Sequence, residues 1–476
     1  MKLRSVFSCI LIAALLAAAM VVPAGAVDGS SQSADPLDAQ TSIHGSGQLL
    51  DTAKSVILYE METDTLVYSW NPDQRLDPSG MNKIMTALLA IELADPDAMV
   101  TVSRKALDSV QIGSVSAGLK AGEEISVKDL LYCMMVGSAN DASAVIAEHI
   151  AGSQEDFVDL MNQRAKDLGC TDTNFMNSNG LSHDQQYSTA RDLAKITLAA
   201  LEDPFFRELF SAVSYTVPAT NKSEPRELVT TNFLMSKDTV RDQYDERVTG
   251  GKTGALSTTD RSLIATAEVD GVRYLSVVMS AQGTVTADGL SVKTFGSFEE
   301  TRALLDHGFE DYAPRQLLYP EQVMDQVPVT DGENDVIVCP AAELTVMLPV
   351  DMAGVDVSYK LQLPEGGLTA PLEQGATVGT IQVWFRGQCV GQSDMVATYQ
   401  VPLAGTRNIP LTPTGEEEAK YAWTTWLLIG GIVVLGLLLG AGLVLVIRHK
   451  IREAKIRRRH KLIRGNVRRG ERHGVE

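Results

Sequence analysis

Residues 49–312 change from strand-like to helical patterning and back, which restricts the fold more than any other feature. Near the start, two β-rich runs flank a turn-prone segment in SVILYEMETDTLVYSW, which predicts a hairpin. Residues 127–200 then carry apolar side chains at helical spacing. A second hairpin, turned by Asp270-Gly271, and a helix over residues 296–312 follow. Strands on both sides of a helical insert predict an α/β domain whose terminal strands share one sheet.

Residues 313–403 are strand-like throughout. GVDVSYKLQL alternates apolar and polar residues, which is typical of a half-buried strand, and TIQVWF and VATYQV are similar. We therefore expect a small β-rich domain here. Cys339 and Cys389 both lie in it, and they either form a disulfide or stay as free thiols.

Apolar segments near both ends place these two domains outside a membrane. Residues 1–26 have a basic start, an apolar run and the small-residue site AGA, the pattern of a secretory signal peptide. Residues 422–447 include 21 uncharged residues, from 427 to 447, enough to span about 30 Å of hydrocarbon. The sequence predicts a single-pass protein of the cell membrane with an extracytoplasmic ectodomain.

The remaining segments are polar, and the charge changes sign at the predicted membrane. Residues 27–48 read as a flexible leader and residues 404–421 as a Pro/Gly/Glu linker. Residues 448–476 hold 12 Lys and Arg against 3 Glu, although the whole chain has a net charge of −19. A basic cytoplasmic tail that attracts membrane lipid explains this, and the acidic ectodomain argues against a nucleic-acid partner. No metal-ligand spacing occurs among the histidines, so we predict no metal and no cofactor.

Three short motifs carry the chemistry. LDPSGMNKIMTALLAIE opens a helix that has Lys83 in its first turn. VGSANDASA contains an S-A-N triplet that begins at Ser138, and GGKTGALS contains K-T-G, which begins at Lys252. The order S-x-x-K, S-D-N and K-T-G is typical of penicillin-binding proteins and class A β-lactamases.

Residues 53–403 resemble the low-molecular-mass penicillin-binding proteins that act as serine D-Ala-D-Ala carboxypeptidases. Besides the motifs, LKAGEEISVKDLLYCMMVGSANDASAVIAEHIAG and NSNGLSHDQQYSTARDLA carry the resemblance. It implies a serine β-lactamase/transpeptidase-like domain over 49–312, a β-rich domain over 313–403 and one transmembrane helix. It also implies removal of the terminal D-Ala from peptidoglycan stem peptides and acylation by β-lactams.

The resemblance assigns the catalytic roles. Lys83 would take the proton of the nucleophilic serine if burial and nearby cations lower its pKa. Ser138 would relay that proton to the leaving amine. Asn140 would hold both the lysine and a carbonyl of the substrate.

The K-T-G motif would bind the substrate. Lys252 would supply a positive charge and Thr253 a hydrogen bond to the terminal carboxylate. Gly254 would let the substrate lie along the strand as an added β-pair. The oxyanion hole would consist of the N–H of residue 80 and an N–H near Ala255 or Leu256.

The nucleophile is where this chain departs from the family. The family pattern P-A-S-x-T-K is replaced by PSGMNK, which puts Gly80 at the position of the serine. Ser79 lies four residues before Lys83, about 6 Å along a helix axis, so a register slip would bring it to the lysine. Alternatively, Ser79 is an N-cap that satisfies the first amides of the helix, which is the reading we favour.

Two functions from different classes remain open. The first is a membrane-anchored D-Ala-D-Ala carboxypeptidase, with Ser79 as a displaced nucleophile. The second is a catalytically inactive protein of the same fold that binds stem peptides or penicillin. Asp260-Arg261, where relatives have a small residue and Gly, is a further departure close to the site. A β-lactamase is a distant third, because Ala139 replaces the aspartate of S-D-N.

Overall fold

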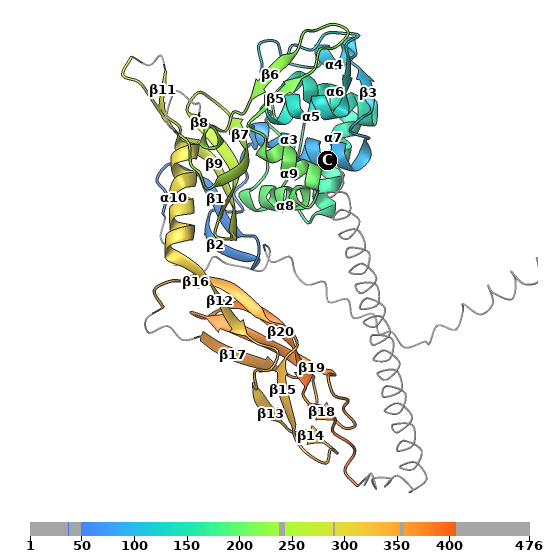
Figure 1. Ribbon diagram of the computed structural model, residues 1–476, viewed down its shortest axis with the longest axis vertical. Coiled ribbons are helices and arrows are strands. Elements are labelled where there is room, and N and C mark those ends of the chain that lie inside the picture. The colour runs from blue at the N-terminus through green and yellow to red at the C-terminus, as the bar shows by residue number, and fades with distance from the viewer. Residues whose placement is uncertain (1–36, 38–48, 238–242, 289–290, 353–356, 406–476) are drawn as a thin grey trace, which may run out of the picture. The chain divides into compact units, whose positions relative to one another are not determined.

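The computed structural model describes residues 37, 49–237, 243–288, 291–352 and 357–405 (Figure 1). The part before residue 312 is built on a five-stranded antiparallel sheet with helices on both faces. Its strands are β1 (Ser55–Glu60), β2 (Thr65–Trp70), β7 (Val248–Ala255), β8 (Asp260–Val269) and β9 (Val272–Gln282).

The sheet joins strands from both ends of this part of the chain. Its order is β2-β1-β9-β8-β7, and Ser55 of β1 pairs with Met279 of β9. The β8–β9 turn has φ of +51° at Asp270 and +84° at Gly271, as a tight two-residue hairpin turn requires. Both predicted hairpins and the shared sheet are therefore confirmed, and β7 lies at an edge of the sheet.

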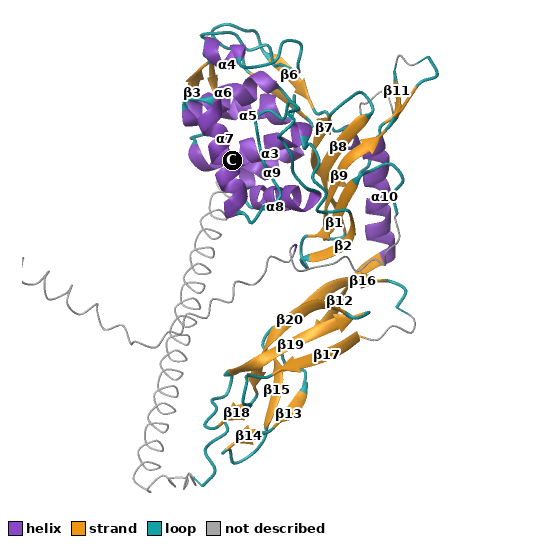
Figure 2. Cartoon of the chain, turned by 180° about the vertical axis from the view of Figure 1, so that it is seen from behind, coloured by secondary structure: helices purple, strands orange, loops and turns teal. Residues whose placement is uncertain are grey.

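Most of the helical insert lies on one face of the sheet, and the closing helix lies on the other (Figure 1, Figure 2). The helices are α3 (Asn82–Leu93), α4 (Arg104–Asp108), α5 (Val127–Met135), α6 (Asn140–Ala151), α7 (Gln154–Asp167), α8 (Ala190–Leu201), α9 (Pro204–Ser211) and α10 (Gly296–Asp311). The 3-10 helices are η1 (Ser79–Met81) and η2 (Phe233–Met235), and the short strands are β3 (Met99–Thr101), β4 (Glu124–Ser126), β5 (Ser214–Val217), β6 (Arg226–Val229), β10 (Thr284–Val285) and β11 (Val292–Thr294).

Helix α3 runs through the middle of the insert. Every residue from Asn82 to Ala90 is buried, because α3 has apolar side chains on all of its faces and not in one stripe. These side chains join the core between the insert and the sheet, while α10 packs against the opposite face. The start of α3 is thus held from all sides. At the start of α8, Thr189 is the N-cap, since its Oγ1 accepts the N–H of Asp192 at 3.0 Å.

Residues from 312 onward form strands. Most of them surround a separate apolar cluster, whereas residues 346–348 join the cluster that includes residues of α10. The strands are β12 (Tyr312–Leu318), β13 (Asp325–Val327), β14 (Val329–Thr330), β15 (Val336–Pro340), β16 (Leu344–Pro349), β17 (Val357–Gln362), β18 (Leu368–Thr369), β19 (Thr377–Phe385) and β20 (Gln388–Ala397). The largest sheet has the order β13-β15-β20-β19-β17. The β17 strand is an edge strand, so Tyr359, which we expected to be half-buried, is 38% exposed. Cys339 and Cys389 are free thiols, the first buried and the second exposed.

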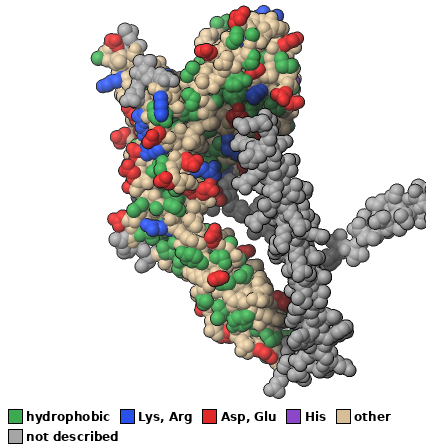
Figure 3. Space-filling view, viewed as in Figure 1, with side chains coloured by type: hydrophobic (Ala, Val, Ile, Leu, Met, Phe, Trp, Pro, Cys, Tyr) green, Lys and Arg blue, Asp and Glu red, His purple; other side chains and the backbone are tan. Residues whose placement is uncertain are grey.

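Several predicted segments lie outside the described residues. They are the signal peptide, the span over 422–447, the basic tail, and all but a few residues of the leader and linker. Among the helices that the structure describes, none is both long and apolar enough to cross a membrane. Figure 3 shows acidic side chains scattered over the visible face with Lys and Arg among them, in keeping with the negative net charge.

Candidate active site

Ser79 begins η1 with an unusual backbone. Its φ is +52°, a left-handed conformation that costs a non-glycine residue about 1–3 kcal/mol and persists only where the surroundings impose it. Asp77 Oδ1 accepts the N–H of Ser79 at 2.8 Å. Gly180 lies so close that a Cβ there would be 1.9 Å from the carbonyl oxygen of Ser79. Ser79 is 3% exposed, and the contacts with Asp77 and Gly180 hold its conformation.

The N-cap assigned to Ser79 from the sequence is wrong. No side chain caps η1 or α3, and the Ser79 hydroxyl instead accepts the N–H of Ala255 on β7 at 2.8 Å. The left-handed backbone turns the side chain of Ser79 away from the helix amides and toward the neighbouring strand. This tertiary contact lies 176 residues along the chain, so helix-start patterns do not reveal it.

Gly80 faces the same strand. A Cβ at position 80 would lie 2.9 Å from the carbonyl oxygen of Thr253, 3.6 Å from Cα of Gly254 and 3.9 Å from Ser138 Oγ. Position 80 therefore points toward the K-T-G strand and the S-A-N serine. The backbone of η1 lies so close to that of β7 that any side chain at position 80 would force one of them to shift.

Lys83 is buried beside Asn140. Its Nζ donates to Asn140 Oδ1 at 2.8 Å and also to the carbonyl oxygen of Asn179. Burial, and secondly the charge of Lys252, hold the pKa of Lys83 well below its usual range. A neutral amine has two N–H donors and one lone pair, so these two bonds leave the lone pair free to accept a proton.

Lys252 joins the K-T-G strand to the S-A-N turn. Its Nζ donates to Ser138 Oγ at 3.0 Å and to the carbonyl oxygen of Thr253 at 3.2 Å. Lys252 is 1% exposed, and burial lowers its pKa to about 7. The hydroxyl of Thr253 bonds that of Thr231 at 2.6 Å. Ser138 itself has φ of +56°, so this turn is also held in a left-handed conformation.

One cavity of about 340 Å³ collects nearly all of the residues singled out in the sequence. They are Ser79, Gly80, Lys83, Ser138, Asn140, Thr253 and Gly254, with Lys252 directly behind Ser138. A larger cavity of about 560 Å³, beside α8 and α9, is lined by none of them. The structure therefore brings the three motifs to one place, although they come from η1 and α3, from the turn that leads into α6, and from β7.

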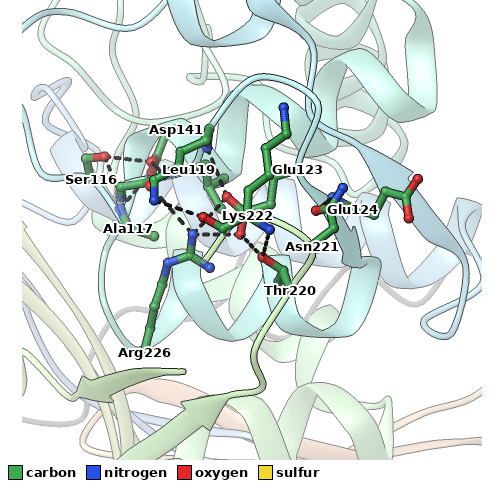
Figure 4. Close-up of polar contacts among 12 residues, drawn as sticks. Ser116, Ala117, Leu119, Glu123, Glu124, Asp141, Thr220, Asn221, Lys222 and Arg226 are labelled. Carbon is green, nitrogen blue, oxygen red and sulfur yellow. Dashed lines mark hydrogen bonds and ion pairs between the residues drawn. The ribbon is translucent and has the colours of Figure 1, made fainter. Parts of the chain in front are cut away.

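The wall of this cavity formed by residues 113–115 is held by a residue that sequence reasoning missed. Asp141 follows the S-A-N triplet and accepts hydrogen bonds from Ser116 Oγ at 2.6 Å, from the N–H of Ala117 at 2.9 Å and from that of Leu119 at 3.1 Å (Figure 4). The N–H of Asn140 also donates to the carbonyl oxygen of Val115 at 2.8 Å. A carboxylate in the first turn of a helix was the available signal.

A buried ion pair supports the same region from behind. Arg226 of β6 contacts Glu123 at 2.6 Å, and Thr220 donates to Glu123 at 2.8 Å (Figure 4). Despite burial, these partners keep the pKa of Glu123 below its usual value. Glu123 is therefore a structural carboxylate that connects the loop before α5 to β6.

Arg261, which follows the K-T-G motif, also lines the cavity. It pairs with Ala255 across β7 and β8, and its guanidinium lies 4.9 Å from the centre of the Phe295 ring. Asp260 instead accepts a hydrogen bond from Ser280 Oγ at 2.9 Å. The guanidinium of Arg261 therefore borders the site, while the carboxylate of Asp260 belongs to the β8–β9 hairpin.

Comparison with known proteins agrees with this geometry. Residues 45–283 match the D-alanyl-D-alanine carboxypeptidase family, and residues 312–403 match the C-terminal domain of penicillin-binding protein 5. This chain belongs to the D-alanyl-D-alanine carboxypeptidase family. That is a family of serine-type hydrolases.

Relatives within the family cover most of the chain. The chain is 30% identical to D-alanyl-D-alanine carboxypeptidase DacC of Escherichia coli, over 74% of this chain and 85% of that protein. It is 29% identical to DacF of Bacillus subtilis, over 75% and 88% respectively. The crystal structure of penicillin-binding protein 5 from Haemophilus influenzae superposes with a TM-score of 0.58 at 27% identity, covering 74% of this chain and 98% of that chain.

Proposed function

We propose that this chain is a membrane-anchored, extracytoplasmic D-Ala-D-Ala carboxypeptidase-like protein that acts on peptidoglycan stem peptides and binds β-lactams. The observation that carries the proposal is the single cavity in which Lys83, Asn140, Ser138 and the K-T-G strand meet. Export and anchoring rest on the sequences of residues 1–26 and 422–447 alone. Membership of the family supports the substrate class.

The K-T-G strand supplies the recognition in this proposal. Lys252 and Thr253 bind the terminal carboxylate through charge-assisted hydrogen bonds. Because β7 is an edge strand, it can pair with an extended peptide. The space beside Gly254 itself is taken by η1, since a Cβ there would lie 3.3 Å from Cβ of Ser79. Asn140 holds a substrate carbonyl while its Oδ1 keeps Lys83 in place.

Hydrolysis in this site requires a hydroxyl, and Ser79 is the serine adjacent to Gly80. In that reaction the oxygen of Ser79 bonds to the carbonyl carbon of the terminal peptide bond, and Lys83 takes the proton. The C–N bond then breaks, and the amine of the released D-Ala receives a proton relayed by Ser138. Water cleaves the resulting ester and regenerates the hydroxyl.

A second function is favoured by a specific observation. The Ser79 hydroxyl bonds the N–H of Ala255, and neither hydrogen bond of Lys83 goes to it. With glycine at position 80, the same site would bind stem peptides or penicillin without cleaving them. In this alternative, Lys252 and Thr253 still bind the terminal carboxylate, but the peptide bond is not cleaved.

Covalent labelling with a reporter penicillin separates the two functions. The ectodomain is incubated with the reporter, and any adduct is located by peptide mass mapping. A stoichiometric adduct on Ser79 establishes the hydrolase through the displaced serine. An unlabelled protein that binds a D-Ala-D-Ala peptide by calorimetry establishes the binding function. A protein that does neither contradicts the proposal as a whole.

We expect Lys252→Ala to weaken binding of a D-Ala-D-Ala peptide by about 1.5–3 kcal/mol, the usual worth of a hydrogen bond to a charged group. This applies to both functions, since the carboxylate is held before any chemistry. Lys195→Ala is the matched control, because it removes a buried lysine whose Nζ donates to the carbonyl oxygen of Gly169 and not to a residue of the three motifs. Unchanged affinity in a folded Lys252→Ala variant would remove the stem-peptide assignment.

A further inference from the structure

The amide that Ser79 occupies is the one that a substrate would need. Along the β7–β8 hairpin, the N–H of Leu256 donates to the carbonyl oxygen of Asp260 at 3.0 Å, so it is used within the hairpin. The N–H of Ala255 points out of the sheet edge and donates to Ser79 Oγ at 2.8 Å. Of the two candidates for the strand half of the oxyanion hole, Ala255 is therefore the one that faces the cavity.

The two backbones around that amide are in close contact. Besides the short distance from position 80 to Thr253, a Cβ on Gly254 would lie 3.3 Å from Cβ of Ser79 and 3.2 Å from the carbonyl oxygen of Pro78. The glycines at positions 80 and 254 face each other, which lets η1 and β7 approach. This approach brings the Ser79 hydroxyl within hydrogen-bond distance of Ala255.

We propose that Ser79 is an internal occupant of the oxyanion site, which keeps the site closed to acylation. The proposal rests on the binding form of the proposed function, in which a D-Ala-D-Ala peptide is the ligand whose carbonyl oxygen would compete for the Ala255 N–H, and it excludes hydrolysis through Ser79. In acyl transfer, the nucleophile attacks a carbonyl whose oxygen accepts hydrogen bonds from the oxyanion hole, here the N–H groups of Gly80 and Ala255. The Ser79 oxygen cannot occupy the Ala255 N–H and also attack a carbonyl that needs it, so Ser79 is an inhibitory residue and not the displaced nucleophile.

Removal of the Ser79 hydroxyl should therefore strengthen ligand binding. In Ser79→Ala the Ala255 N–H becomes available to a peptide carbonyl, and we expect a D-Ala-D-Ala peptide to bind about 2- to 10-fold more tightly, the usual range for one hydrogen bond. Ser114→Ala is the control, because it removes another cavity-lining serine without freeing this amide. If alanine proves unstable at the left-handed position, Ser79→Gly tests the same point without backbone strain.

Acylation provides the second readout. Gly80→Ser restores a hydroxyl three residues before Lys83, but it also crowds Thr253 and leaves Ser79 in place. We expect a reporter penicillin to acylate Gly80→Ser slowly and the double variant Ser79→Ala/Gly80→Ser about tenfold faster or more, since one oxyanion donor is worth on the order of 10²–10³ in rate. Ser79→Ala alone should not be acylated.

Each outcome decides one of the two proposals. If the folded parent protein binds no D-Ala-D-Ala peptide, the proposed function fails. If the parent binds the peptide but Ser79→Ala binds it no more tightly than the parent, only the oxyanion proposal fails. A double variant acylated no faster than Gly80→Ser, or a stoichiometric penicillin adduct on Ser79 of the parent, also overturns it.

Discussion

Lys252 should give binding a characteristic dependence on pH. Its pKa of about 7 in the free protein results from burial, and it must be protonated to attract a carboxylate. A bound carboxylate favours the charged form, so the pKa of Lys252 is higher in the complex. Affinity for a D-Ala-D-Ala peptide should therefore be nearly constant below about pH 7 with respect to this group, and should fall by up to about tenfold per pH unit above it.

Isothermal titration calorimetry between about pH 6 and about pH 9 measures this dependence. The matched variant is Lys252→Arg, whose guanidinium keeps its charge over the whole range. Lys252→Arg should bind the peptide less tightly, because a planar guanidinium does not reproduce the contacts of the lysine ammonium. Its affinity should, however, vary less with pH. An affinity of the parent protein that is flat across this range would contradict the role of a titrating lysine.

At the scale of elements, Gly180 contacts η1, so replacing it by alanine should destabilise the fold more than the same change at a left-handed glycine with open space around it. Gly180 has φ of +79°, and Gly152, which ends α6, has φ of +80° with open space around it. Gly152→Ala should cost about 1–2 kcal/mol of folding stability, from backbone strain alone. Gly180→Ala should cost at least about 2 kcal/mol more, because its Cβ overlaps the backbone of Ser79.

Urea unfolding of the two variants, beside the parent, measures this difference in the free energy of unfolding. Gly180→Ala should also weaken binding of the D-Ala-D-Ala peptide, since η1 borders the cavity, whereas Gly152→Ala should not. Equal destabilisation by the two variants would show that η1 yields to the added methyl group and is not held in place by Gly180.

The elements also show what the sequence could and could not predict. The hairpins of the sheet and α3 were predictable, because periodicity and turn residues act over a few neighbouring residues. The three motifs predicted which residues share the cavity. The partner of Ser79 was not predictable, because it depends on a left-handed backbone and on a strand far along the chain. The exposure of Tyr359 depends in the same way on β17 being an edge strand.

At the scale of the whole molecule, a chain cut before Glu416 should be released as a soluble, signal-processed ectodomain. The reason is that the predicted span over 427–447 and the basic tail are the segments expected to hold it to lipid. Membrane fractionation in high salt, with the full chain beside the truncated one, measures this. A truncated ectodomain that remains with the membrane would contradict a single C-terminal anchor.

The pairing of β1 with β9 also sets an order of events while the chain is being made. The hairpin of β1 and β2 emerges early, but its partner emerges only after the whole helical insert, because Ser55 pairs with Met279. Contacts between distant residues form late and slow folding, whereas helices of the insert can form from local contacts. Until β9 arrives, one edge of β1 has no strand beside it, and such an edge can pair with another chain. The growing chain is therefore most vulnerable to aggregation after β1 and β2 appear and before β9 does.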